Sequence, residues 1–147
     1  MAVNHIPDGY HAVTSYFTVK GADRLLEFVK AVFGAKEVHR MNRSDGTIGH
    51  AELRIGDSVI MLSEANTEWP ANPGGVYVYV PDVDATYQKA LAAGATSLRA
   101  PEDQFYGDRG AGIRDASGVT WWIGTHVEDV SPAEMQKRMA AATRKTN

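Results

Sequence analysis

Alternating apolar and polar residues mark the stretch at 49–62 as a β-hairpin. Two runs of period two flank Gly56 and Asp57, a two-residue connection of the kind that joins antiparallel strands. Residues opposite each other in such a hairpin share a face of the sheet. One predicted face is therefore apolar and suited to cover by a helix. The other face carries three ionisable side chains: His50, Glu52 and Arg54.

The residues before this hairpin predict a strand, a helix and a further strand. Residues 1–12 predict a loosely held lead-in, and the β-branched and aromatic run at 14–19 predicts the first strand. Apolar side chains recur at helical spacing over residues 22–33, and Gly34 suits the end of that helix because glycine adopts left-handed geometry. Residues 36–43 predict a strand that leads into the hairpin, which completes a β-α-β-β-β unit.

The same order of elements returns after a linker rich in proline and glycine. Gly94 follows Gly34, and Trp122 follows Met61, at a spacing of about 60 residues. Asp82 is placed to cap the helix of the second unit. A repeat of this length indicates duplication of one supersecondary unit, which cannot bury its sheet face alone.

We therefore predict an α+β fold in which two tandem modules form a curved, half-open barrel of mixed β-sheet with the helices outside. A C-terminal helix should follow, because Ser131, Pro132 and Glu134 form a capping box. That helix would pack either on its own subunit or on a second copy of the chain. The bounds of this single domain and its parts are as follows: whole domain 1–147, module one 14–65, module two 75–124 and C-terminal helix 131–143.

Composition limits the classes of partner. The 147 residues are 44% hydrophobic and 22% charged, as in ordinary globular proteins. A net charge of −3 without a long basic run gives no electrostatic basis for binding nucleic acid. The absence of cysteine excludes disulfides and thiolate metal sites and fits a reducing, cytoplasmic setting. We expect no membrane partner, because neither a signal peptide nor a membrane-spanning apolar run is present.

Three sequence strings resemble one known family. They are HAELRIGDS at 50–58, DQFYGDR at 103–109 and WWIGTHVEDVSP at 121–132. Together with the duplicated unit, they are similar to the vicinal oxygen chelate superfamily, which includes glyoxalase I, extradiol dioxygenases and bleomycin- and fosfomycin-resistance proteins. The strings most resemble its PhnB-like, glyoxalase/bleomycin-resistance-type branch. The resemblance implies a cup between modules and a homodimer.

The resemblance also implies where a catalytic relative would hold a divalent metal. Its ligands come from the first and last strands of each module, which correspond to Thr14, Met61, Gly75 and Trp122. None of these side chains is an imidazole or a carboxylate, the usual ligands for such an ion. We therefore expect no metal ligand at these positions and no cofactor, while a divalent metal held elsewhere stays open.

The same alignment predicts which side chains line the cup. They are aromatic or polar, as expected for a site that holds a small organic molecule. The predicted ligand-binding residues are Thr14, Tyr16, Arg54, Met61, Tyr77, Tyr79, Tyr106, Arg109 and Trp122. Alternatively, Trp122 fills the space that a metal leaves, and Arg109 locks a turn with Asp108 or Asp103. The remaining histidines, among them His126, have no metal spacing and are typical of surface or capping positions.

Three functions remain compatible with this pattern. The first is a binding protein that holds an organic ligand in the cup without a metal. The second is an enzyme, either a glyoxalase-like isomerase or lyase or a dioxygenase-type enzyme, with a relocated metal or with His50 and Glu52 as catalytic acid and base. The third is a dimerising scaffold whose cup is packed shut by Tyr77, Tyr79 and Trp122.

Overall fold

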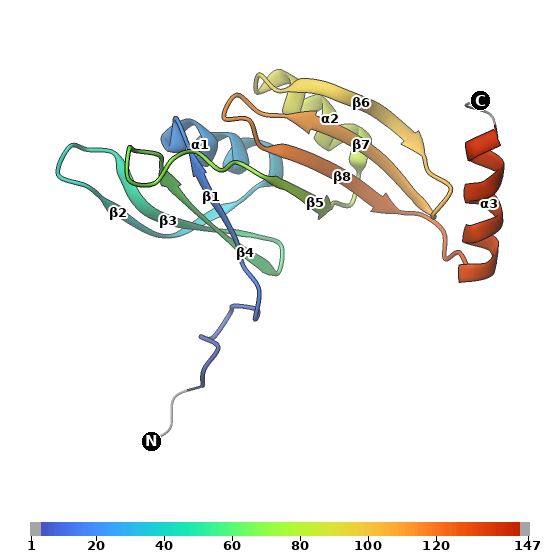
Figure 1. The fold of residues 1–147 in the computed structure, drawn as a ribbon, viewed down its shortest axis with the longest axis horizontal. Coiled ribbons are helices and arrows are strands. Elements are labelled where there is room, and N and C mark those ends of the chain that lie inside the picture. The colour runs from blue at the N-terminus through green and yellow to red at the C-terminus, as the bar shows by residue number, and fades with distance from the viewer. Residues whose placement is uncertain (1–3, 145–147) are drawn as a thin grey trace.

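The computed structural model describes residues 4–144, and the two predicted modules follow one another along the chain (Figure 1). Module one contains β1 (Ser15–Val19), α1 (Ala22–Phe33), β2 (Lys36–Asn42), β3 (Ile48–Ile55) and β4 (Ser58–Glu64). Module two contains β5 (Gly75–Tyr79), α2 (Val83–Ala92), β6 (Thr96–Asp103), β7 (Asp108–Arg114) and β8 (Thr120–His126). Helix α3 (Pro132–Arg144) follows.

Each module folds into its own four-stranded mixed sheet. The strand order is β1-β4-β3-β2 in sheet one and β5-β8-β7-β6 in sheet two. The first and last strands of each module pair in parallel, and the other pairs are antiparallel. The predicted α+β class, with two β-α-β-β-β modules and a C-terminal helix, is confirmed. Within the described residues, no strand of sheet one pairs with a strand of sheet two.

The β3–β4 hairpin has the predicted register. Leu53 pairs with Ile60, and Glu52 pairs with Met61. Leu53 and Ile60 are buried on the face that α1 covers, whereas Glu52 and Met61 stay partly exposed on the other face. The alternation of apolar and polar residues therefore decides which face of sheet one meets the core.

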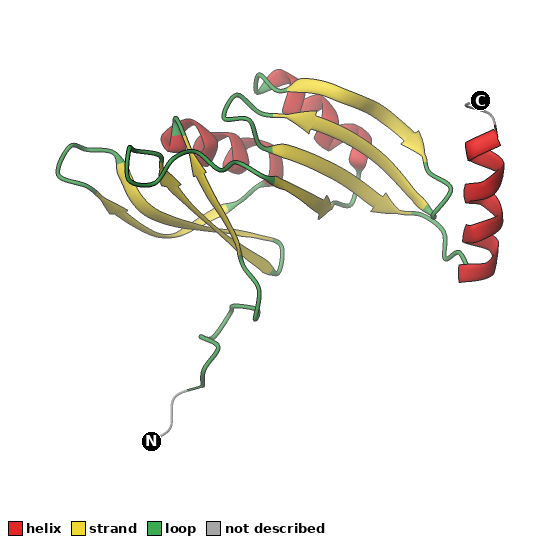
Figure 2. Cartoon of the chain, viewed as in Figure 1, coloured by secondary structure: helices red, strands yellow, loops and turns green. Residues whose placement is uncertain are grey.

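The two modules share one hydrophobic core. Helices α1 and α2 contact each other, and both lie behind the sheets in the view of Figure 2. Trp121 of β8 is fully buried, and its ring centroid lies 4.9 Å from that of Phe33 and 5.8 Å from that of Phe17. Because Phe17 and Phe33 belong to module one, Trp121 joins the modules.

We call the face of each sheet opposite its own helix the open face.

The first two helices are capped in different ways. The predicted cap of α2 is confirmed, since the Asp82 side chain accepts a hydrogen bond from the backbone N–H of Ala85 at 3.1 Å. Helix α1 has no side-chain cap of its own at Gly21. The Glu64 carboxylate, at the end of β4, accepts from the N–H groups of Gly21 and Ala22 at 3.1 and 2.7 Å.

No helix in the described residues is long and apolar enough to cross a membrane.

Helix α3 contacts its own chain. The Ser131 hydroxyl accepts a hydrogen bond from the N–H of Glu134 at 3.2 Å, which is one half of the predicted capping box, while the Glu134 carboxylate accepts from Arg138 Nε at 3.2 Å. The Arg138 guanidinium donates to both Glu128 oxygens at 2.8 and 3.0 Å and to the Phe105 carbonyl at 3.4 Å. These contacts hold α3 at the end of sheet two, where it stands apart from sheet one (Figure 1).

Candidate functional site

Large aromatic side chains remain exposed on the open faces of both sheets. Tyr16 on sheet one is 47% exposed, and Trp122, Tyr77 and Tyr79 on sheet two are 36%, 40% and 65% exposed. Exposed apolar patches of this kind mark interaction sites in folded proteins. In this single chain the three residues on sheet two line an accessible surface.

Four side chains form a hydrogen-bonded cluster on the open face of sheet one, here called the Glu52 cluster: Tyr10, Tyr16, His50 and Glu52. The Tyr10 hydroxyl donates to Glu52 Oε2, and His50 Nε2 lies 3.0 Å from Glu52 Oε1. The Tyr16 hydroxyl lies 3.2 Å from His50 Nδ1. The hydrogen bond from Tyr10, supported by His50 and opposed by burial, holds the pKa of Glu52 below its usual value. The predicted acid–base pair is thus brought together, with Glu52 ionised at neutral pH.

The chain before β1 contributes to this open face. Arg54 Nη1 donates to the carbonyl oxygen of Gly9 at 3.1 Å, and the next residue, Tyr10, reaches Glu52. These contacts tie down the lead-in that the sequence pattern predicts to be loose. No periodic pattern surrounds Tyr10, so the sequence offers no signal for its role. Arg54, a predicted ligand contact, here positions the lead-in.

Five side chains form a second cluster on the open face of sheet two, here called the Asp108 cluster: Tyr77, Tyr79, Asp108, His126 and Asp129. Asp108 is buried, and its Oδ2 accepts hydrogen bonds from Tyr77 at 2.8 Å and from Tyr79 at 3.1 Å. His126 Nδ1 lies 2.8 Å from Asp108 Oδ1, and its Nε2 lies 2.8 Å from Asp129 Oδ1. Neither Asp108 nor His126 belongs to the predicted site. The sequence signal for Asp108 and His126 is strand alternation, which places them on the face opposite their neighbours Arg109 and Thr125.

The Asp108 cluster has defined charge states. Burial acts to raise the pKa of Asp108, but hydrogen bonds with His126 and both tyrosines outweigh it and hold this pKa below its usual value. Asp129 and Asp108 raise the pKa of His126. Burial, followed by the hydrogen bond to Asp108, raises the pKa of Tyr77. At neutral pH the cluster therefore contains a buried Asp108 carboxylate that accepts hydrogen bonds from two neutral tyrosine hydroxyls.

Glycines let the aromatic rings of sheet two lie against the backbone. A β-carbon at Gly112 would lie 2.5 Å from the Trp122 ring, and one at Gly124 would lie 2.3 Å from the Tyr77 hydroxyl. Gly112 is the register partner of Trp122 on β7, and Gly124 lies on β8 between β5 and β7. The missing side chain at Gly124 thus allows Tyr77 to cross β8 and reach Asp108.

Four rings make up what we call the aromatic platform: Tyr77, Tyr79, Tyr106 and Trp122. The ring centroids of Tyr77 and Tyr79 lie 5.1 Å apart. Tyr106 is close enough to contribute to the raised pKa of Tyr77. The Arg99 guanidinium lies 5.4 Å from the ring centroid of Trp122. Ring faces of this kind attract planar groups and cations.

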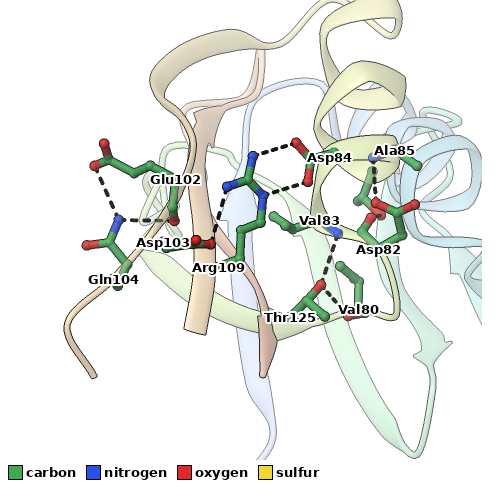
Figure 3. Close-up of polar contacts among 11 residues, drawn as sticks. Val80, Asp82, Val83, Asp84, Ala85, Glu102, Asp103, Gln104, Arg109 and Thr125 are labelled. Carbon is green, nitrogen blue, oxygen red and sulfur yellow. Dashed lines mark hydrogen bonds and ion pairs between the residues drawn. The ribbon is translucent and has the colours of Figure 1, made fainter. Parts of the chain in front are cut away.

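Arg109 lies on the helix side of sheet two. Its Nε and Nη2 donate to Asp84 of α2 at 2.8 and 3.0 Å, and its Nη1 donates to Asp103 at 3.3 Å (Figure 3). Asp103, one of the two alternative partners, is therefore bonded to Arg109, and Asp108 is not. Adjacent residues of a strand point to opposite faces, so Arg109 is directed away from Tyr106 and the platform.

The positions that correspond to metal ligands do not form a metal site. Thr14 precedes β1, Met61 lies in β4, Gly75 begins β5 and Trp122 lies in β8. They offer a hydroxyl, a thioether, no side chain and an indole, which are poor ligands for a hard or borderline divalent ion. Among the described residues, no group of three His, Asp or Glu side chains could hold a metal ion. The donor set therefore does not fit the metal of catalytic relatives.

A hollow of about 480 Å³ lies between the modules. The turn at Gly56 and Asp57, the start of β4 and residues 76–79 of β5, among them Tyr77 and Tyr79, line it. Its volume falls in the range of small-molecule sites. The platform therefore adjoins this partly open hollow at its β5 edge.

The sequence matches one family description. A model described as Glyoxalase/Bleomycin resistance protein/Dioxygenase superfamily matches residues 5–123. An uncharacterized protein of Mycobacterium bovis is 34% identical over 152 residues, which cover 96% of this chain and 97% of that protein. An uncharacterized protein of Mycobacterium tuberculosis has the same identity over 96% of this chain and 87% of its own length.

Solved structures share the fold. TioX from Micromonospora sp. ML1 is 26% identical, with a TM-score of 0.62 over 79% of this chain and 100% of TioX. TnmS3, described as an antibiotic binding protein from Streptomyces sp. CB03234, is 17% identical, with a TM-score of 0.62 over 86% of this chain and 98% of TnmS3. A PhnB protein from Bacillus cereus is 19% identical, with a TM-score of 0.64 over 78% of this chain and 99% of its own. At these identities TnmS3 and the PhnB protein show likeness of fold alone.

Proposed function

The chain belongs to the Glyoxalase/Bleomycin resistance protein/Dioxygenase superfamily, and on this premise we propose that it binds a small organic molecule without the divalent metal of catalytic relatives. The observation that carries the proposal is the aromatic platform, of which Tyr77, Tyr79 and Trp122 stay exposed on a sheet face that no helix of its own module covers. The description of TnmS3 as an antibiotic binding protein supports the same class of function on the same fold. The three sequence strings favour the PhnB-like branch within the superfamily.

The binding surface draws on both modules. On sheet one, the ligand would contact side chains on the open face: Thr14, Tyr16 and Met61. On sheet two, it would contact the aromatic platform. Arg54, bonded to the Gly9 carbonyl, would position the lead-in. Arg109, bonded to Asp84, would hold α2 from outside the binding surface. His50 and Glu52 would supply polar contacts at the wall of sheet one.

We further propose a homodimer that forms the cup. The open faces of one chain belong to two separate sheets that share no strand pairing within the described residues. A second copy could set its sheet one against sheet two of the first chain, and the reverse. Exposed aromatic side chains on both open faces would then be buried around the ligand, which is the usual fate of such patches.

Substitution of Trp122 tests the binding function. A panel of planar aromatic compounds is first screened by thermal melting, because a ligand that binds the native state raises the melting temperature. For a compound that binds, Trp122→Ala should lower affinity about tenfold through loss of ring contact, while the unliganded melting temperature changes little. Trp69→Ala is the matched control, since Trp69 is 64% exposed in the linker. Equal affinity of the Trp122 variant and the parent would contradict the proposal.

The Glu52 cluster favours a second candidate function, an acid–base enzyme. His50 lies between the Glu52 carboxylate and the Tyr16 hydroxyl, so a proton could pass along hydrogen bonds to a substrate on sheet one. Turnover of a glyoxalase-type hemithioacetal should then be lost in Glu52→Gln and retained in Glu68→Gln, with both variants folded. An upward shift of the melting temperature with Ni, Zn, Mn or Fe(II) would instead favour an enzyme with a relocated metal.

A further inference from the structure

We propose that the aromatic platform selects a ligand that carries a positive charge on or beside a planar ring, with the charge held over Tyr77 and Tyr79. This inference rests on the proposed binding function and names the chemical class of its ligand. It follows from the position of a buried carboxylate at the hydroxyl ends of two exposed tyrosine rings. The contacts of the Asp108 cluster carry it.

The two tyrosines present ring faces and no spare donor. Both hydroxyls donate to Asp108 Oδ2, at 2.8 Å from Tyr77 and 3.1 Å from Tyr79. Their protons are therefore directed toward the sheet and are unavailable to an anionic ligand. What remains accessible is part of each ring, since Tyr77 is 40% and Tyr79 is 65% exposed. A cation gains from such faces, whereas an anion does not.

The negative charge of Asp108, at the hydroxyl ends of the two rings, also favours a cation over an anion. The Asp108 side chain is 4% exposed, so water screens its charge poorly. His126 bonds to Asp108 and also to Asp129, and even a protonated His126 leaves this trio with one net negative charge. An anionic ligand over the tyrosines would meet this remaining negative charge, whereas a cation would be attracted by it.

Two other features of the open faces agree with a cation. On Trp122, the other exposed ring of this face, the Arg99 guanidinium lies 5.4 Å from the ring centroid. The indole thus already holds a cation, and the positive charge of Arg99 would direct the charge of a ligand toward the tyrosines. On sheet one, the Glu52 cluster repeats the arrangement of the Asp108 cluster, since a carboxylate there accepts from a tyrosine hydroxyl and bonds to a histidine. Both walls of the proposed cup would therefore present a carboxylate among aromatic rings.

A matched pair of probes tests the inference. N-Methylquinolinium carries a fixed positive charge, and quinoline has the same ring system but is uncharged at pH 8. Affinities are measured by titration calorimetry, and the amide signals of Gly112 and Gly124, together with the Trp122 indole signal, locate each probe by NMR. We expect the cation to bind at the platform at least fivefold more tightly than quinoline.

Two variants of equal charge change separate local from general electrostatics. Asp108→Asn keeps a hydrogen-bonding group and should bring the ratio of the two affinities toward one. Glu68→Gln removes one negative charge from the exposed linker and should leave the ratio unchanged. If Asp108→Asn fails to fold, Asp129→Asn at the exposed end of the cluster should lower the ratio in part.

The outcomes distinguish this inference from the binding function. Equal affinity of the unmodified protein for both probes would overturn the charge preference and leave a binding surface in place. An equal fall of the ratio in Asp108→Asn and Glu68→Gln would also overturn it, because the effect would then be long-range. Binding of neither probe at the platform would overturn the proposed function together with this inference.

Discussion

At the scale of single residues, a step of one position along β7 separates two roles. Asp108 faces the open side and accepts hydrogen bonds from Tyr77 and Tyr79. Arg109, the next residue, faces the helix side and pairs with Asp84. Alternation of side chains along a strand is the physical cause. Whether a side chain faces the open side or the helix side thus depends on its position in the strand as much as on its residue type.

Substitution of Gly124 tests how closely the Tyr77 ring packs against β8. A β-carbon there would lie 2.3 Å from the Tyr77 hydroxyl, so Gly124→Ala should displace that ring and break its bond to Asp108. We expect a loss of about 1–3 kcal/mol in the free energy of unfolding, measured by urea titration. Gly75→Ala is the control, because its β-carbon would come no closer than 3.5 Å to Thr120. Equal stability of both variants would show that the ring can shift without cost.

His126 provides a pH-dependent prediction. Asp129 and Asp108 raise its pKa above the ordinary value of 6.5, so the folded state holds the proton more tightly than the unfolded state. Its stabilising contribution is complete below the unfolded pKa and is lost as the pH rises through the higher folded pKa. The free energy of unfolding should fall across that window in the unmodified protein and should not fall in His126→Gln. A parallel fall in both proteins would assign the pH dependence to another group.

At the scale of elements, the two modules use different means to fix equivalent helices. Helix α2 is capped by its own Asp82, whereas α1 is capped by Glu64 from the end of β4. Module two adds the bonds between Arg109 and Asp84, which tie the start of α2 to β7 (Figure 3). The duplicated units therefore share a topology while their anchoring contacts have diverged.

Two arginines on opposite faces of sheet two give the prediction at this scale. Arg109→Gln should lower the melting temperature and leave the affinity for N-methylquinolinium unchanged, because Arg109 contacts α2 and not the platform. Arg99→Gln should do the reverse: removal of the guanidinium from Trp122 should raise cation affinity about two- to threefold with little change in melting temperature. A weaker affinity in Arg109→Gln would return this residue to the binding surface.

At the scale of the whole molecule, the proposed binding site falls into two halves on one chain. The Glu52 cluster belongs to sheet one and the aromatic platform to sheet two, and the core around Trp121 joins the modules on the helix side. A homodimer would complete two cups, each with one wall from either chain. A cup formed within one chain would require the two open faces to turn toward each other.

Mixing two variants with weakened binding tests this arrangement. Tyr16→Ala damages the wall of sheet one, and Trp122→Ala damages the wall of sheet two. If each cup combines two chains, a mixture of the variants, unfolded and refolded together, should recover binding at about a quarter of the sites, because mixed dimers contain one intact cup. Calorimetric stoichiometry measures the recovery. No recovery, with dimers present by sedimentation, would place each cup within a single chain.

The sequence by itself determined the elements, the register of the first hairpin, the duplication and the family. Each depends on local spacing: period two for the strands, helical spacing for residues 22–33 and a cap at Asp82. Because alternation places His50 and Glu52 on one strand face, their meeting was also predictable. The same reasoning placed Tyr77 and Tyr79 on the open side.

Only the tertiary structure decided which distant groups those side chains meet. Tyr10, in a segment without periodicity, donates a hydrogen bond to Glu52. Tyr77 donates to Asp108 from two strands away, and it crosses β8 where Gly124 has no side chain. Arg109 finds its partner on a helix that packs beneath the sheet. Such contacts depend on how separate elements pack in three dimensions, and a pattern along one strand records which face a side chain occupies but not what stands across from it.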